Sequence, residues 1–314
     1  MTTPEPLADR PAPAPIGGAP SATDPRPAAR RSRALEVSGG ETDRTSRARR
    51  TTLRVLSVLA FFALWWGLTQ AGVWDPLFIP RPGAVWDRFV ESLQTHTTTT
   101  SAGFVIEKRG LQGSLLWEHW WATVQRILWG LLWAVVVGVP LGLLLTTVNW
   151  FRVVFEPWID FLRSLPPLAY FSLLIIWFGI GDTSKIWLLF LAGVAPITLS
   201  IVSGARSIPR DRLLAAQALG ASRLQTIRFL VLPSVLPDFF NGFRLAVGFA
   251  WTTIVAAETT AGLPGLGGLA WASKKTGRSD IVILSIIVIG ITAVLFDYGI
   301  KAAERRLLPW RGRG

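Results

Sequence analysis

The stretch that decides the fold is residues 127–151, which read ILWGLLWAVVVGVPLGLLLTTVNWF and contain no Asp, Glu, Lys or Arg. A helix needs roughly 20 apolar residues to cross the hydrocarbon core of a bilayer, so this stretch predicts a membrane-spanning helix. Residues 55–74, 164–181 and 186–205 are equally free of charged side chains. Two further apolar stretches, residues 239–260 and 281–300, contain few ionisable groups.

The sequence therefore predicts an all-α integral membrane protein of six transmembrane helices. The expected spans are about residues 53–74, 126–149, 164–181, 185–206, 238–260 and 281–301. Half of the 314 residues are apolar and 17% are charged, whereas about a quarter of a soluble domain is charged. The chain has no cysteine and two histidines, which argues against thiolate chemistry and multi-His metal centres. We expect no catalytic residue, no metal and no cofactor.

Charge outside the spans predicts the orientation. Residues 1–50 hold eight prolines before position 30 and few aromatic side chains, a composition typical of a disordered tail, here a basic one. On the six-span topology, 23 of the 32 Lys and Arg lie on the side of the N-terminus. The positive-inside rule then puts both termini in the cytoplasm. It also accounts for the basic cluster at positions 44–54, which contains five arginines, without a role in nucleic-acid binding. Most of the 16 tryptophans fall near span ends, where interfacial anchors lie.

The predicted outer loop covers residues 75–122. Residues 84–93 place Val85, Phe89 and Leu93 at helical spacing, which predicts a short amphipathic helix lying along the bilayer surface. Residues 95–113 are polar and contain glycine, so we expect a flexible loop there. We expect His96 and His119, at the two ends of this region, to be ordinary surface histidines.

The inner segment, residues 207–236, contains IPRDRLLAAQALGASRLQTIRFLVLP at positions 208–233. Pro209 is suited to a helix start, and Gly220 to the left-handed residue that ends a helix. Ser222 is suited to cap a second helix that runs to Pro233. We expect two short exposed helices joined at Gly220, with small residues on a surface that a large partner can approach closely.

This segment resembles the cytoplasmic "EAA---G---------I-LP" loop of ABC importer permeases. The match comprises Ala215-Ala216, Gly220 and Leu230-Val231-Leu232-Pro233, while Leu214 replaces the acidic residue and Leu230 the isoleucine. The resemblance implies a coupling helix that seats in a groove of the ATP-hydrolysing subunit. The residues expected to dock that subunit are Arg212, Leu214, Ala215, Ala216, Gln217, Gly220, Ala221 and Arg223.

Other runs look like the nitrate, sulfonate, taurine and bicarbonate branch of this family: residues 163–169, 177–185, 242–244, 251–258 and 304–310. The Pro-Pro-Leu-Ala run at 166–169 and the closing Pro309-Trp310 look most like taurine permeases. The resemblance implies a permease in a bacterial inner membrane that imports taurine or another aliphatic sulfonate. Nitrate, bicarbonate and a small heterocycle stay as alternatives.

The resemblance also implies the partners. These are two copies of an ABC ATP-binding subunit, an extracytoplasmic solute-binding protein and a second permease copy, as a homodimer in the bilayer. The Gly-rich residues 262–268 are then a mobile outer loop that touches the solute-binding protein. No GxxxxGK[ST] motif occurs in the chain, so ATP hydrolysis is expected on a separate polypeptide.

Four residues are candidates for the translocation pathway: Pro166, Pro167, Arg244 and Glu258. Glu258 among apolar neighbours either lines the pathway or its outer gate, or pairs with a neighbouring helix. The two prolines form a hinge or simply start a helix, and Arg244 binds either substrate or lipid headgroups.

Asp297 is expected to pair with Lys301. A membrane-embedded transferase working through Glu258 and Asp297 is disfavoured, because the two carboxylates lie near opposite membrane faces. A channel is disfavoured because a ring of charges or carbonyls is lacking.

Overall fold

The computed structural model describes residues 49, 52–53, 55–72, 74–99, 105–262 and 264–309. The tail expected over residues 1–50 lies outside these apart from residue 49. The chain divides into two units, Met1–Leu64 and Trp65–Gly314. An apolar helix, Val55–Gln70, runs across their boundary.

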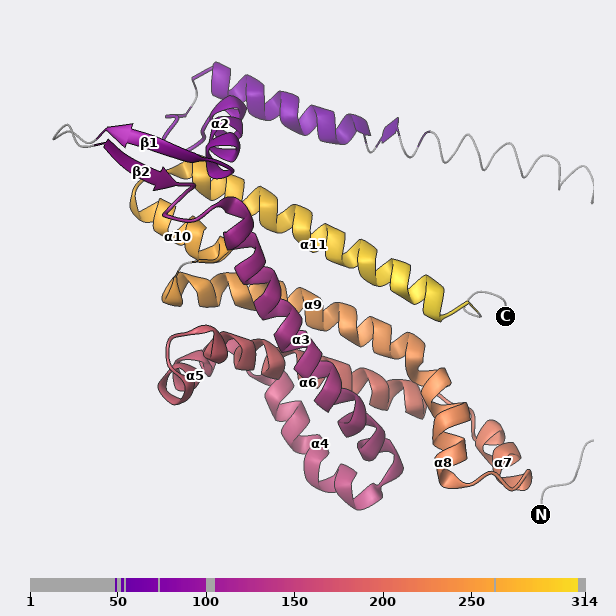
Figure 1. Ribbon diagram of the computed structural model, residues 1–314. Coiled ribbons are helices and arrows are strands. Elements are labelled where there is room, and N and C mark those ends of the chain that lie inside the picture. The colour runs from indigo at the N-terminus through magenta and orange to yellow at the C-terminus, as the bar shows by residue number, and fades with distance from the viewer. Residues whose placement is uncertain are drawn as a thin grey trace, which may run out of the picture. The chain divides into compact units, whose positions relative to one another are not determined.

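The second unit is mostly helical (Figure 1). Its elements in chain order are α2 (Pro82–Ser92), β1 (Thr95–Thr99), β2 (Val105–Arg109), α3 (Leu116–Thr147), α4 (Asn149–Ser164), a 3-10 turn (Pro167–Ala169), α5 (Phe171–Phe178), α6 (Asp182–Arg206), α7 (Arg210–Ala218), α8 (Arg223–Thr226), a π-helical turn (Ile227–Val231), α9 (Leu232–Ala261), α10 (Leu266–Lys275) and α11 (Ser279–Leu307).

Four helical runs among the described residues are long and apolar enough to cross a membrane. They are α3, α6, the run Arg223–Thr260 that includes α9, and α11. The prediction of a helical integral membrane protein is confirmed, while the count of six spans is not. The helix Val55–Gln70, where the first span was expected, is apolar but shorter than these four.

The third expected span, residues 164–181, is wrong as a single helix. The 8-residue α5 is its only α-helix, and covers about 12 Å at 1.5 Å per residue. Pro166 and Pro167 interrupt the chain between α4 and α5, because proline cannot donate to the helical ladder. Gly179, with φ 81°, ends α5. The path from the end of α3 to the start of α6 is thus built from two helices separated by a break.

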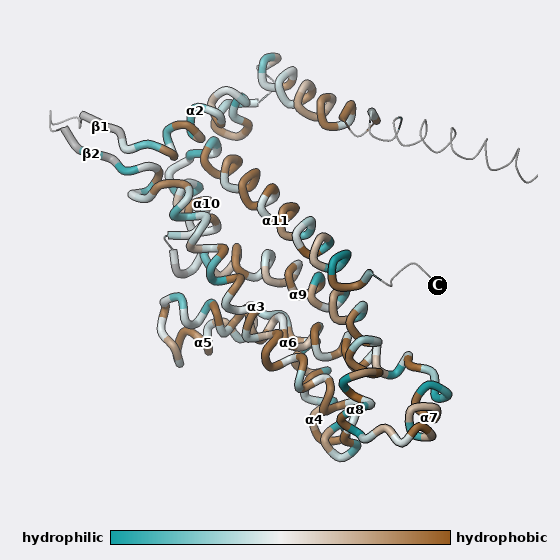
Figure 2. Tube along the Cα trace, turned by 45° about the vertical axis from the view of Figure 1, so that its right-hand side comes forward, coloured by the Kyte–Doolittle hydropathy of each residue, from teal (hydrophilic) through white to brown (hydrophobic). Residues whose placement is uncertain are grey.

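The core lies where α6 packs between α3 and α9, as Figure 1 shows. Ile127, Leu189, Ile197 and Ile254 are all fully buried there. Figure 2 shows that apolar residues also run along the outer sides of these helices and of α11. Trp133 of α3 and Leu295 of α11, for example, are 51% and 62% exposed. An apolar surface around an apolar core fits a protein whose solvent is lipid.

A stripe of small residues on α3 lets α6 approach closely. Gly130, Ala134, Gly138 and Gly142 recur every four residues and therefore share one helix face. A Cβ at Gly138 would lie 3.1 Å from Ile197 Cγ2, and one at Gly142 would lie 2.9 Å from Ile201 Cβ. Small residues at this spacing are the usual contact surface between membrane helices.

Replacing Gly142 by alanine is expected to lower the free energy of unfolding by about 1–3 kcal/mol, because the methyl group overpacks the contact with Ile201. Gly290→Ala in α11 is the matched control, since nothing lies within 4 Å of a Cβ there. The measurement is thermal unfolding of both variants in one detergent. Equal midpoints for the two would contradict the assigned close approach.

The predicted outer loop is partly right. The amphipathic helix is present as α2, which starts two residues before and ends one residue before the expected bounds. The flexible loop expected over residues 95–113 is wrong, because β1 and β2 pair there as an antiparallel hairpin in which Thr95 opposes Arg109. The Thr-rich first strand and the Val and Ile of the second are β-branched, and such residues favour strands.

Candidate functional site

The α7–α8 segment has the local structure that its sequence predicts. Pro209 immediately precedes α7, and Gly220 adopts φ 76° after its end, in the left-handed region that favours glycine. Ser222 Oγ accepts a hydrogen bond from the backbone N of Gln225 at 3.3 Å. The Gln225 side chain accepts in turn from the backbone N of Ser222 at 2.8 Å. This reciprocal capping box fixes the start of α8.

The second short helix does not end at Pro233, which corrects the prediction. Instead α8 continues through the π-helical turn Ile227–Val231 into α9, where Pro233 occupies the first turn. Inside a helix, proline removes one backbone hydrogen bond and its ring clashes with the carbonyl one turn earlier. In the first turn of a helix neither penalty arises, because that N–H has no partner within the helix. The α7–α8 segment is therefore continuous with a membrane-spanning helix, so that a displacement at α8 acts directly on α9.

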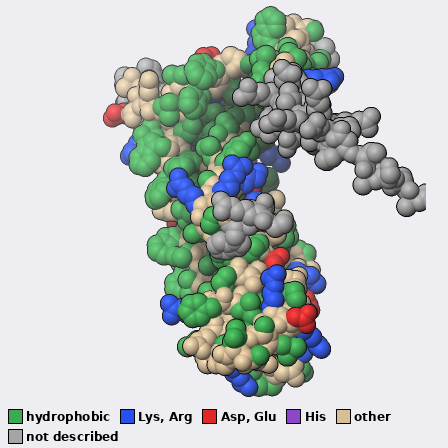
Figure 3. All heavy atoms as spheres, turned by 90° about the vertical axis from the view of Figure 1, so that its right-hand side faces the viewer, with side chains coloured by type: hydrophobic (Ala, Val, Ile, Leu, Met, Phe, Trp, Pro, Cys, Tyr) green, Lys and Arg blue, Asp and Glu red, His purple; other side chains and the backbone are tan. Residues whose placement is uncertain are grey.

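The outward face of α7 and α8 is exposed and apolar. Leu219 is 87% exposed, Leu224 75% and Phe229 71%. A groove of about 650 Å³ crosses this face between Ala215, Gly220 and Phe229. A Cβ built on Gly220 meets nothing within 4 Å. Figure 3 looks onto this end of the molecule, where charged side chains lie among exposed hydrophobic ones. Exposed apolar side chains of this kind mark sites of contact with another protein or with a membrane.

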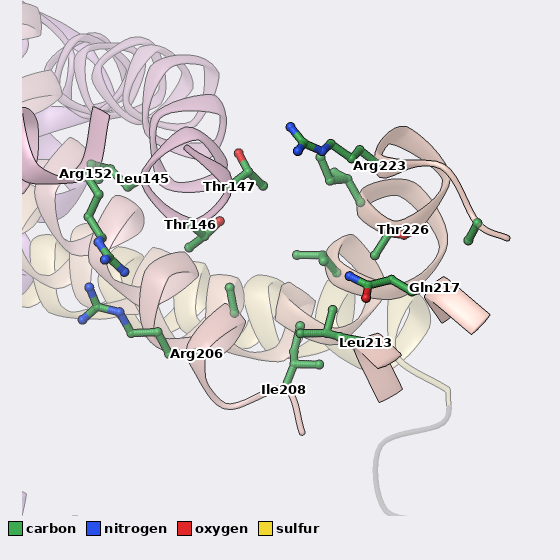
Figure 4. A pocket seen from close by; sticks show the side chains of 14 residues that line it. Leu145, Thr146, Thr147, Arg152, Arg206, Ile208, Leu213, Gln217, Arg223 and Thr226 are labelled. Atoms are coloured by element: carbon green, nitrogen blue, oxygen red, sulfur yellow. The ribbon is translucent and has the colours of Figure 1, made fainter. Parts of the chain in front are cut away.

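The eight predicted docking residues divide between two sides of the segment. Five of them line the groove: Arg212, Ala215, Ala216, Gly220 and Ala221. Leu214 is exposed as expected, at 60%. Gln217 and Arg223 instead line a second cavity between α7–α8 and the ends of α3 and α6 (Figure 4). A docking role for all eight residues stays a prediction.

Glu258 lies in a buried ion pair at the opposite end of the bundle. It is fully buried, and Arg126 Nη1 donates to its Oε1 at 2.6 Å. Thr123 Oγ1 donates to the same carboxylate at 2.9 Å, and the backbone N of Gly267 at 2.9 Å. Arg126 Nε also donates to Asp182 at 2.8 Å. The cluster joins α3, α6, α9 and α10. These contacts are the ones expected if Glu258 pairs with a neighbouring helix.

The Gly-rich segment after α9 packs against this carboxylate, so the expected mobile loop is wrong for residues 264–268. Leu266, Gly267 and Gly268 are buried in the first turn of α10. A Cβ on Gly265 would lie 2.6 Å from Glu258 Cδ, and one on Gly267 would lie 2.6 Å from the Val255 carbonyl. The glycines are needed for this close approach. Contact with a solute-binding protein stays a prediction.

His119 is not a surface residue, which corrects the prediction for it. The side chain is fully buried, and its Nδ1 accepts a hydrogen bond from the backbone N of Gly265 at 3.1 Å. Its Nε2 therefore carries the proton and donates to the Leu111 carbonyl at 3.0 Å. His119 thus ties the start of α10 to the hairpin region.

Two of the predicted pathway residues, Arg244 and Glu258, are not brought together. Glu258 lies 14 positions after Arg244 on the same helix, about 21 Å away along its axis. Arg244 Nη2 donates to Glu304 at 3.0 Å, and its Nε lies 3.2 Å from Asp297. The predicted Asp297–Lys301 pair is confirmed. A pathway role for Pro166, Pro167, Arg244 and Glu258 stays a prediction.

Three buried partners were not predicted from the sequence: Thr123, Arg126 and Lys185. Arg126 and Lys185 stand directly before uncharged stretches, the usual place of interfacial charges, yet each is only 2% exposed. Lys185 lies three positions after Asp182, which puts both on one helix face and was an available signal. Glu258 lies 132 positions after Arg126, so no local pattern indicated that pair.

Comparison with known proteins gives concordant matches. Residues 127–309 match the model of the family described as "binding-protein-dependent transport system inner membrane component". The taurine transport system permease protein TauC of Escherichia coli is 37% identical over 265 residues, which cover 84% of this chain and 92% of that protein. The bicarbonate transport system permease protein CmpB of Synechocystis is 27% identical, over 81% of this chain and 88% of that protein. An inward-facing structure of the MetNI methionine ABC transporter matches 60% of this chain and 96% of that chain, with 20% identity and a TM-score of 0.48.

Proposed function

Because the chain belongs to the family of binding-protein-dependent transport system inner membrane components, it is a permease subunit of an ABC transporter, and we propose that it imports taurine or another aliphatic sulfonate. It is a transporter subunit and not an enzyme. Membership implies two kinds of partner, an ATP-binding subunit and a solute-binding protein.

The α7–α8 surface is the proposed docking site for the ATP-binding subunit. Its support is the exposed groove over Ala215, Ala216 and Gly220, on a segment that continues into α9. Closure of the ATP-binding subunits would displace α7 and α8, and the continuous α8–α9 helix would carry this displacement into the membrane.

Two permease copies and two ATP-binding subunits form the proposed complex, in the inner membrane of a bacterium. Both chain termini are proposed to be cytoplasmic, on the side of α7 and α8. In support, Arg244 in the first half of α9 pairs with Glu304 near the end of α11, so α11 runs toward the end of the bundle where α9 begins. The extracytoplasmic solute-binding protein is then proposed to approach the α2, hairpin and α10 end.

The substrate proposal rests on the identity with the taurine permease. At 37% over most of both chains it exceeds the 27% with the bicarbonate permease, so a sulfonate is favoured over bicarbonate. Nitrate and a small heterocycle stay as alternatives.

Deleting the gene is expected to abolish growth on taurine as sole sulfur source and leave growth on sulfate unchanged. Complementation with the intact gene should restore growth, and complementation with Gly220→Val should not. Undiminished taurine growth of the deletion strain would overturn the substrate proposal. Uptake of labelled nitrate and bicarbonate by the same strains then tests the alternatives.

A further inference from the structure

The cavity between α7–α8 and the ends of the membrane helices is basic. It has a volume of about 460 Å³ and is drawn in Figure 4. Three arginines line it, Arg152 of α4, Arg206 of α6 and Arg223 of α8, and no Asp or Glu does. Its size falls in the range of about 300–1,000 Å³ that small-molecule sites occupy.

The arginines are arranged around the cavity rather than along one helix. Figure 4 shows the guanidinium groups of Arg152 and Arg206 turned toward one another, with Arg223 on the other side of the cavity. Like charges that face one another repel, and an anion between them removes that cost. Three chain segments thus contribute positive charge to one space.

Most of this charge is not neutralised by the described residues. Arg206 Nη2 pairs with Glu156 at 2.6 Å, and Arg152 Nη2 donates to the neutral Asn149 side chain at 2.6 Å. A guanidinium has five N–H donors, so each keeps several for a ligand. The hydroxyls of Thr146 and Thr147 both donate to the Leu143 carbonyl, so the arginines are the principal donors facing the cavity.

The floor of the cavity is apolar. Leu145, Ile208 and Val231 are buried at its base, with exposures of 1%, 9% and 8%. A basic rim over an apolar floor at the end of the membrane helices matches an anionic headgroup with its first carbons. Basic pockets between membrane helices on the cytoplasmic side bind such headgroups.

We propose that this cavity binds a phosphate- or sulfonate-type oxyanion, supplied by an anionic phospholipid headgroup or by the solute itself, which clamps α7–α8 to the ends of α3, α4 and α6. The inference rests on the proposed function in that α7 and α8 face the cytoplasm. A bound anion would then control how much of a displacement of the ATP-binding subunit is transmitted through α7 and α8 to α9.

Native mass spectrometry of the purified ATPase–permease complex tests this, with phosphatidylglycerol or phosphatidylcholine added in detergent. We expect the complex to retain phosphatidylglycerol in preference to phosphatidylcholine. Arg152→Gln/Arg206→Gln should weaken this retention about tenfold or more, at about 1 kcal/mol for each arginine. The control Arg163→Gln/Arg228→Gln removes the same charge from residues that do not line the cavity, and should retain the lipid as the parent does.

A second arm identifies the source of the anion. Inorganic phosphate and taurine are titrated separately against the lipid-free complex. If phosphate or taurine binds the parent complex but not the Arg152→Gln/Arg206→Gln variant, the cavity holds a free oxyanion. If only the lipid binds, the cavity holds the lipid headgroup. The proposal is overturned if neither binds, or if cavity and control variants behave alike.

Assembly of the variants separates this inference from the proposed function. Arg152 and Arg206 lie outside α7 and α8, so the ATP-binding subunit should stay in the complex. Its absence in the parent complex would instead count against the docking proposal. The single variant Arg152→Gln loses a hydrogen bond to Asn149 within the same helical turn, and gives the same test if the double variant does not fold.

Discussion

Arg126→Met is expected to lower the free energy of unfolding by about 3–5 kcal/mol, because it leaves a buried carboxylate without its cation. Glu258 is fully buried, and of its hydrogen bonds to the described residues those from Thr123 and Gly267 would remain. Glu258→Met should cost less, because Arg126 keeps a second carboxylate, Asp182, whose side chain is 49% exposed. Denaturant titration in detergent measures both values.

The double variant Arg126→Met/Glu258→Met should recover most of the loss, since neither charge then remains unpaired. Arg163→Met/Asp160→Met is the matched control. That pair spans 3.3 Å with side chains 61% and 48% exposed, and exposed pairs contribute about 0–1 kcal/mol. Similar coupling energies for the buried and exposed pairs would contradict the account of the Arg126–Glu258 contact.

The same double variant separates the two roles offered for Glu258. If the carboxylate only holds α9 and α10 against α3, uptake should return together with stability. If it also gates the pathway, stability returns and uptake does not. Retained uptake of Glu258→Ala at normal expression would reject the gating role.

The second large effect is expected at Gly220. Gly220→Val should reduce recovery of the ATP-binding subunit with the permease about tenfold or more, while the permease still inserts in the membrane. The left-handed φ of 76° costs a side-chain-bearing residue about 1–2 kcal/mol, and a β-branched one more. Because nothing lies within 4 Å of a Cβ there, the defect would come from the turn and not from a clash within the chain.

Gly220→Asn is the control for this prediction, since asparagine tolerates the left-handed region best after glycine. It should retain most of the complex if backbone conformation is the requirement. Loss with both variants would mean that the partner contacts this position too closely for any side chain. An undiminished complex with Gly220→Val would contradict docking through α7 and α8.

Local signals carried much of the prediction. The uncharged runs indicate α3 and α6, and the Pro209, Gly220 and Ser222 pattern indicates the two short helices, because these features depend on residues within a turn of one another. The Asp297–Lys301 pair was predictable for the same reason. The local pattern was misleading at residues 95–113. Their polar, glycine-containing composition is typical of a loop, but two strands pair there as a hairpin.

The rest depends on contacts between distant segments. Thr123 and Glu258 are 135 positions apart, and His119 and Gly265 are 146. Periodicity on one helix does not indicate which residue on another will meet it. The broken path through α4 and α5 was missed because hydropathy counts apolar residues and not the prolines at 166 and 167 that interrupt the helix. The basic cavity likewise combines arginines from three separate helices.

The α7–α8 surface is proposed to contact a separate ATP-binding subunit. The chain contains no cysteine, so one introduced thiol is a unique attachment point for a thiol-directed photocrosslinker. Leu219→Cys, at a position 87% exposed on that surface, should crosslink to the ATP-binding subunit in the assembled transporter. Trp86→Cys, at a position 64% exposed on α2 at the opposite end, should not. No adduct at position 219, or equal adducts at both positions, would contradict the account.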